Sequence, residues 1–218
     1  MRGFLKAGTA LAMVLGLVLA GNVWAGENAG ASIMADLEIQ GQVQAGYQGN
    51  AKLEGIGPDV TVVLSIYTKG VSNLIAYTFE IGFDAEELEY VSGGFMNTNP
   101  VELGVLSAWS PSTVGPALKP GTNNIIGGGA AILANPPGAD QAPDGDGLLL
   151  AVLTFKTKST FTTGSKAAFW LSALTYKGVD GTEDDVTGNW DPDYALAAIN
   201  RDIAVENSSW AKIKALFR

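Results

Sequence analysis

Residues 74–84 read LIAYTFEIGFD, and this stretch decides the fold. Large apolar side chains stand at every second position, namely Ile75, Tyr77, Phe79, Ile81 and Phe83. The positions between them are small or polar. Such alternation is typical of a β-strand with one face in a core and the other in water. The aromatic residues of the apolar face are therefore expected to pack inside the protein and not to form a sugar-stacking strip.

Further stretches of the same kind lie on both sides of it. Strands are predicted at 60–67 (VTVVLSIY), 88–91 (LEYV), 124–133 (NIIGGGAAIL), 148–158 (LLLAVLTFKTK) and 167–176 (AAFWLSALTY), with a shorter one near 105–109. The three central glycines of 124–133 mark a bulge or a close approach by another backbone. Turn-forming residues separate these stretches, and no amphipathic helix lies among them. The pattern predicts an all-β sandwich.

The first 25 residues have the layout of a secretory signal peptide. Arg2 and Lys6 precede the apolar run 10–20, and Val23-Trp24-Ala25 offers small residues where a signal peptidase cuts. The run is shorter than the roughly 20 residues that span a bilayer, and no later segment is long and apolar enough to do so. We therefore expect cleavage after Ala25 and an extracellular or cell-surface location.

Composition excludes several classes of function. Without Arg2 and Lys6, eleven basic residues face 22 acidic ones, a net charge of −11 that disfavours nucleic acid. The sequence has no cysteine and no histidine. This rules out disulfides, a Ser-His-Asp triad, a cysteine nucleophile and the usual Cys/His zinc site. No carboxylate pair stands in a recognisable catalytic frame, so we expect a protein that is not an enzyme.

Three stretches in order resemble a cohesin domain: TVVLSIYTKGV from residue 61, LIAYTFEIGFDAEELEYVSG from residue 74, and DGLLLAVLTFKTK from residue 146. The second is similar to the cohesin strand that runs into an aromatic–Asp–Pro turn, except that Ala85 replaces the proline. The resemblance covers about residues 60–176. It implies a nine-stranded jelly-roll-like sandwich that holds a dockerin, a calcium-loaded module of another polypeptide, on one sheet face.

The outward positions of the 74–84 strand are the candidate docking surface. Matched by position, Ala76 and Thr78 fall where cohesins often carry Asn and Asp, so the dockerin specificity of known cohesins does not transfer. Small side chains let a partner backbone come close. The candidate partner-binding residues are Ala76, Thr78, Glu80, Gly127, Gly128 and Gly129.

Two other kinds of site stay open. Trp109, Trp190 and Tyr194 stand in or near loops and are candidates for stacking on sugar rings, with ordinary loop packing as the alternative. Asp140, Asp144 and Asp146 surround a turn and are candidates for a structural calcium, with a solvated turn as the alternative. No other cofactor is expected.

The C-terminal stretch differs from the rest of the chain. Ser208-Ser209 can cap a helix in which Trp210, Ile213, Leu216 and Phe217 follow helical spacing, and Lys212, Lys214 and Arg218 make it basic. It is either a cap on the sandwich or a tag that docks to a surface or sorting partner.

The expected organisation follows from these readings. It comprises a signal peptide at 1–25, a linker with a candidate first strand at 26–56, a cohesin-like sandwich at 57–190 and an extension with a short basic helix at 191–218. The expected function is an extracellular, non-catalytic binding module for a dockerin-like or other protein, within a polysaccharide-binding or polysaccharide-degrading assembly. The alternatives are a carbohydrate-binding module and a structural surface or matrix protein.

Overall fold

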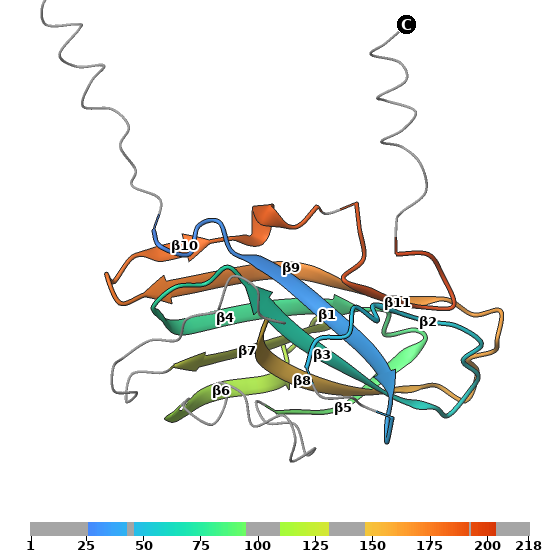
Figure 1. Ribbon diagram of the computed structural model, residues 1–218. Helices are drawn as coiled ribbons and strands as arrows, with labels where there is room; N and C mark the ends of the chain where they lie inside the picture. Colours follow the sequence, from blue (N-terminus) through green and yellow to red (C-terminus); the bar gives the residue numbers. More distant parts are fainter. Residues whose placement is uncertain (1–25, 43–45, 95–109, 131–146, 192, 204–218) are drawn as a thin grey trace, which may run out of the picture.

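Two β-sheets pack face to face in the computed structural model, which describes residues 26–42, 46–94, 110–130, 147–191 and 193–203 (Figure 1). The first sheet has the order β1-β3-β8-β5, formed by β1 (Ser32–Ile39), β3 (Thr61–Lys69), β8 (Leu148–Thr157) and β5 (Leu88–Gly94). All of its neighbouring strands are antiparallel. In Figure 1, β1 and β3 run diagonally across the direction of the second sheet.

The second sheet has the order β2-β11-β9-β4-β7-β6. Its strands are β2 (Lys52–Leu53), β11 (Ala197–Ile199), β9 (Ala167–Gly178), β4 (Leu74–Phe83), β7 (Asn124–Ala130) and β6 (Ser110–Leu118). The short β10 (Glu183–Asp185) also pairs with β9, and the 3-10 helix η2 (Thr187–Asn189) follows it. The pairs are antiparallel except for β2 with β11, which are parallel.

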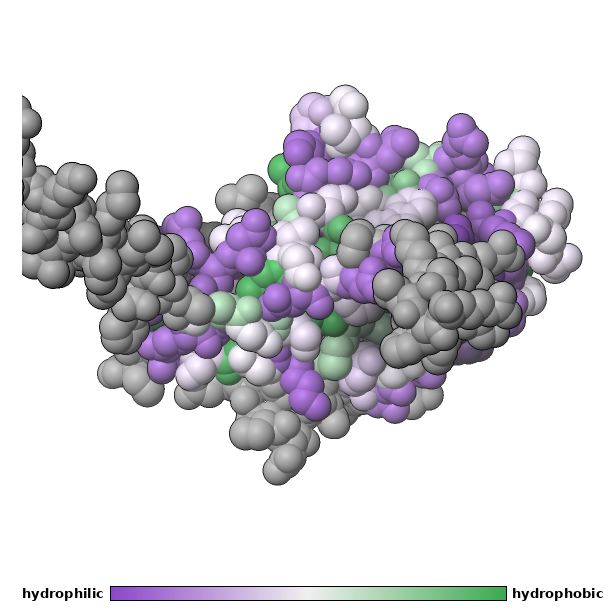
Figure 2. Space-filling model, turned by 90° about the horizontal axis from the view of Figure 1, so that it is seen from above, coloured by the Kyte–Doolittle hydropathy of each residue, from purple (hydrophilic) through white to green (hydrophobic). Residues whose placement is uncertain are grey.

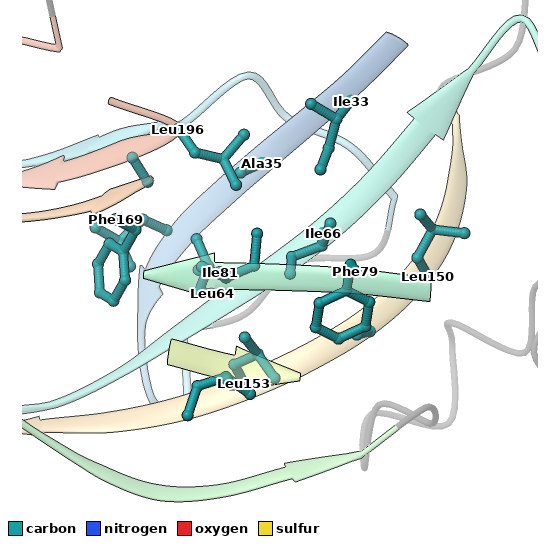
Figure 3. Close-up of a cluster of buried hydrophobic side chains, with 14 of the residues drawn as sticks. Ile33, Ala35, Leu64, Ile66, Phe79, Ile81, Leu150, Leu153, Phe169 and Leu196 are labelled. Atoms are coloured by element: carbon teal, nitrogen blue, oxygen red, sulfur yellow. The ribbon is translucent and has the colours of Figure 1, made fainter. Parts of the chain in front are cut away.

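Side chains from both sheets meet in one core, as the alternating pattern requires. Leu64 and Ile66 of β3 are fully buried opposite Phe79 and Ile81 of β4, and Phe169 of β9 closes the same cluster. Figure 3 shows these side chains pointing toward one another, together with Ile33, Ala35, Leu150, Leu153 and Leu196. Burying an aliphatic or aromatic side chain of this size contributes about 1.5–3 kcal/mol. The core is therefore what holds this cysteine-free protein together.

The outer face of the first sheet is partly covered by its own chain. Asp36 of β1 is only 2% exposed, and its carboxylate accepts hydrogen bonds from the backbone N–H groups of Gln48 (2.6 Å) and Asn50 (2.7 Å). The Tyr47 ring packs edge-on against Tyr67 of β3 at 5.6 Å. Burial, and then the nearby Asp36 carboxylate, raise the pKa of the Tyr47 hydroxyl. Residues 47–50 therefore lie against the outer face of the first sheet.

The all-β sandwich predicted from the sequence is confirmed. The described residues hold eleven strands where the resemblance implied nine, and three of the eleven, β2, β10 and β11, are only two or three residues long. Both β1 and β11 belong to the sheets, so hydrogen-bonded pairing runs from Ser32 to Ile199, beyond the expected sandwich at 57–190. The strand expected near 105–109, the signal peptide and the C-terminal helix lie outside the described residues.

Candidate functional site

β4 sorts its side chains between the core and the outer surface of the second sheet. Tyr77 and Phe79 are 2% and 3% exposed, while Thr78 between them is exposed and Glu80 is half-buried. Ile75 departs from the expected pattern and is half-buried, whereas Leu74 is fully buried. The pairing of β4 with β9 shifts register between Leu74 and Ala76, and such a bulge re-aims the side chains beside it.

The glycines of β7 make room for the aromatic rings of β4. A Cβ on Gly127 would lie 2.7 Å from the Phe79 ring, and one on Gly129 would lie 3.0 Å from the Tyr77 ring. These two glycines therefore face the interior. Gly128 pairs with Thr78 on the outer side, where a Cβ would lie 2.6 Å from the Tyr77 carbonyl oxygen. The glycine run therefore marks a close approach, as predicted, and β7 is approached by the Tyr77 and Phe79 rings of β4 as well as by its backbone.

A shallow hollow of about 440 Å³ opens on the outer side of this sheet. It is lined by all six residues that the sequence proposed for partner binding, which are Ala76, Thr78, Glu80, Gly127, Gly128 and Gly129. Ile126 and Ala173 complete it from the neighbouring strands, and Tyr77 and Phe79 line it from below. We call the outward-facing part of this surface the docking face, defined by Ala76, Thr78, Glu80, Ile126, Gly128 and Ala173.

Glu80 fixes a negative charge on the docking face. Its carboxylate forms an ion pair with the Lys119 ammonium (2.8 Å) and accepts a hydrogen bond from the Asn124 side chain. The hydrogen bond from Lys119, and then that from Asn124, hold the pKa of Glu80 below its usual value. Sequence reasoning missed Lys119, since it lies 39 residues from Glu80 in the turn between β6 and β7.

The aromatic candidates for sugar binding lie apart from this hollow. Trp190 is half-buried and packs against the core, and its indole N–H donates to the Tyr194 carbonyl at 3.0 Å. Tyr194 is exposed. Trp109 lies outside the described residues. Trp190 thus has a structural role in closing the turn after η2.

The acidic side chains on either side of Asp184 in β10 are engaged with protein groups. Glu183 pairs with Lys177 at 3.1 Å, and Asp185 accepts a hydrogen bond from the Thr187 backbone at 3.0 Å. Across the described part of the chain, no three His, Cys, Asp or Glu residues are arranged to hold a metal ion. The calcium candidates Asp140, Asp144 and Asp146 lie outside that part.

Polar residues spread over the side of the molecule seen in Figure 2, with apolar residues scattered between them. Among the described residues, no helix is of a length and hydropathy that would cross a membrane.

Comparison with known proteins gives likeness at the level of the fold. No protein-family model and no curated protein matches the sequence. Among solved structures, the sixth cohesin of the Acetivibrio cellulolyticus scaffoldin B, in complex with a Cel5 dockerin, matches 78% of this chain and 99% of its own at 18% identity and a TM-score of 0.45.

Two further solved structures are similar to this chain at the same level. A type II cohesin domain from the cellulosome of the same bacterium covers 78% of this chain and 98% of its own, at 12% identity and a TM-score of 0.45. A cohesin module from a Clostridium perfringens family 33 glycoside hydrolase covers 71% and 91%, at 12% identity and a TM-score of 0.41.

Proposed function

We propose that this chain is a non-catalytic module that captures a protein partner on the docking face. The observation that carries the proposal is the hollow itself, where the small side chains of Ala76, Thr78 and Ala173 lie on strands that are hydrogen-bonded into the second sheet. Thr78 is exposed and lines the hollow, with Gly128 opposite it on β7. Small side chains on a rigid sheet let a partner backbone approach closely with little loss of conformational entropy.

Chemistry on the docking face supports binding and not catalysis. Both oxygens of Glu80 are already occupied, by Lys119 and by Asn124. With its pKa lowered, Glu80 stays ionised near neutral pH and is a poor proton donor or acceptor there. Among the described residues that line the hollow, the remaining groups of this kind are the Tyr77 and Thr78 hydroxyls, and Tyr77 donates its hydroxyl to the Leu150 carbonyl.

The partner class that we propose is a dockerin-like module. The support is the sequence resemblance to cohesins across residues 60–176, in which the docking positions fall on the same strand. Ala76 and Thr78 differ from the Asn and Asp of many cohesins, so the partner recognised here has its own specificity. We place the module outside the cell, in a polysaccharide-degrading assembly, on the basis of the predicted signal peptide and the same resemblance.

The test is a binding measurement with a panel of purified, calcium-loaded dockerin modules. Thr78→Arg places a long charged side chain over the hollow and should weaken capture by at least about 100-fold, the effect of losing a central contact. Because Thr78 is exposed, the melting temperature of the Thr78→Arg protein should equal that of the wild type. Thr163→Arg is the matched control, since Thr163 is exposed in the loop between β8 and β9.

Three outcomes distinguish the proposed function from its alternatives. Equal binding by the Thr78→Arg and Thr163→Arg proteins would remove the docking face from the proposal. Failure of every dockerin, with capture of a different extracellular protein that Thr78→Arg abolishes, would keep the face and change the partner class. Retention on polysaccharide that depends on Trp190 would favour the carbohydrate-binding alternative.

A further inference from the structure

The turn at residues 26–31, expected to be part of a linker, is tied to the sandwich. Asn28 is fully buried, and its side-chain oxygen accepts a hydrogen bond from the Ser72 backbone at 2.9 Å. The Asn189 side-chain amide donates to the carbonyl oxygens of Ala29 and Ala31, both at 2.8 Å. In Figure 1 this turn, drawn in blue, lies beside β10. The hydrogen bonds hold the turn in place from its first described residues.

Asp184 of β10 binds the start of this turn. Asp184 is only 7% exposed. Its two carboxylate oxygens accept hydrogen bonds from the backbone nitrogens of Gly26 (2.8 Å) and Asn28 (3.0 Å). In the part of the chain that the structure describes, no lysine or arginine pairs with Asp184. A buried carboxylate without a positive partner is costly, even when hydrogen bonds satisfy it.

Glycine is required where the chain meets Asp184. A Cβ on residue 26 would lie 2.4 Å from one carboxylate oxygen of Asp184 and 2.6 Å from the other. Any other residue would force the nitrogen and the carboxylate apart or displace the Asp184 side chain. The contact is therefore specific for the nitrogen of a glycine.

That nitrogen is the atom that leader removal would change. The sequence predicts cleavage after Ala25, where a leader peptidase adds water across the peptide bond between Ala25 and Gly26. Ala25 then leaves as a carboxylate, and the Gly26 nitrogen takes up protons to become an α-ammonium near neutral pH, because free α-amino groups have pKa values of about 7.7–8.0.

We propose that cleavage between Ala25 and Gly26 supplies the missing positive charge for Asp184. The new ammonium of Gly26 forms a charge-assisted hydrogen bond with the Asp184 carboxylate, which is stronger than the amide hydrogen bond it replaces. The ion pair fastens the N-terminal turn to β10 and to the edge of β9. Processing thereby stabilises the exported form of the protein relative to the precursor.

The first measurement is the N-terminus of the protein exported after expression of the full chain. Mass spectrometry should show that it begins at Gly26. A protein that begins at any other residue overturns the proposal.

The second measurement compares two chains, one starting at Gly26 and one that retains Ala25. The chain starting at Gly26 should melt at least about 3 °C higher, since roughly 1 kcal/mol moves the melting temperature of a domain this size by 2–4 °C. Asp184→Asn should remove the difference between the two starts. Glu183→Gln is the matched control and should leave it intact, because Glu183 pairs with Lys177 instead. Equal melting temperatures, or a difference that persists in Asp184→Asn, contradict the proposal.

A third measurement covers the case in which Asp184→Asn does not fold. NMR titration of the Gly26 α-amino group in the unaltered processed chain should give a pKa above the 7.7–8.0 of a free α-amine, because a contacting carboxylate favours the charged form. Asp184 is the carboxylate that the Gly26 nitrogen contacts, and the nearby Glu27 is engaged by Asn73 at 2.8 Å. A pKa at or below the free value overturns the proposal.

Discussion

Glu80 shows how a single side chain on the docking face is held in place. Lys119, the first residue after β6, and Asn124, the first residue of β7, engage its two oxygens. The carboxylate therefore has a fixed direction, and a partner meets a preformed charge. Sequence reasoning placed Glu80 on the outer face from alternation alone. It had no means of finding Lys119, since pairing across two strands depends on sheet order, which local pattern does not encode.

Glu80→Gln should lower the free energy of unfolding by about 0.5–1 kcal/mol at pH 7, the usual range for a partly exposed pair. The pKa of Glu80 is lowered in the folded state, so its contribution is fully present above the ordinary value of 4.5. It is lost as the pH falls through the lowered folded pKa. Urea unfolding should therefore separate the two proteins at pH 7, and the gap should narrow as the pH falls from the ordinary value of 4.5 toward pH 3.

Glu86→Gln is the control for this effect, because Glu86 is exposed and forms no ion pair among the described residues. It should change stability by less than about 0.5 kcal/mol at either pH. A gap between wild type and Glu80→Gln that is the same at pH 3 as at pH 7 would mean that the carboxylate's charge is not what Lys119 and Asn124 stabilise.

At the scale of the element, hydrophobic alternation predicted the long strands well. β3, β4, β8 and β9 begin and end within two residues of the expected stretches. β6 was missed, since Pro111 and Pro116 lie within it and proline usually marks loops. β10 and β11 are three residues each, too short to show a period. Both form by pairing with the same edge of β9.

The close packing of the β7 glycines against the β4 rings can be tested by substitution. Gly127→Ala should lower the free energy of unfolding by about 1–3 kcal/mol, the usual effect of overpacking a core, because its Cβ would meet the Phe79 ring at 2.7 Å. Phe79→Leu combined with Gly127→Ala should recover part of the loss that the two changes cause separately. Chemical denaturation of the two single variants and the double variant measures this coupling.

Gly188→Ala is the matched control, since a Cβ there would meet no atom within 4 Å and the backbone has no left-handed φ. It should stay within about 0.5 kcal/mol of wild type. If Gly127→Ala is as harmless as Gly188→Ala, the glycines of β7 are not required by the rings beneath them.

At the scale of the whole molecule, the two ends of the described chain complete the sandwich. β1 pairs with β3, and β11 pairs with β9 and β2, so both segments belong to the sheets, although the sequence placed them outside the sandwich. Local pattern did not predict this, because each of the two strands pairs with a strand that is distant in sequence. β1 carries Ile33, Ala35 and Leu37 inward, but Asp36 and Glu38 on its other face are also buried and obscure the pattern.

The same architecture predicts how far the C-terminus can be shortened. Residues 195–199 are buried, and Leu196 and Ile199 are 1% and 0% exposed. Removing Ala195–Arg218 deletes β11 and uncovers β9, and should cost about 4 kcal/mol or more, since two large aliphatic side chains leave the core. Removing Ser208–Arg218 should leave the melting temperature within about 2 °C of the full chain, because both sheets stay whole.

Thermal melts of the two truncated proteins, followed by circular dichroism in the β-sheet region, make the comparison. Retention at the cell surface is measured on the shorter deletion in parallel, since a docking tail would lose retention there while the sandwich stays folded. Equal melting temperatures for both truncations would show that β11 adds little to the core, and that the sandwich closes on β9 without it.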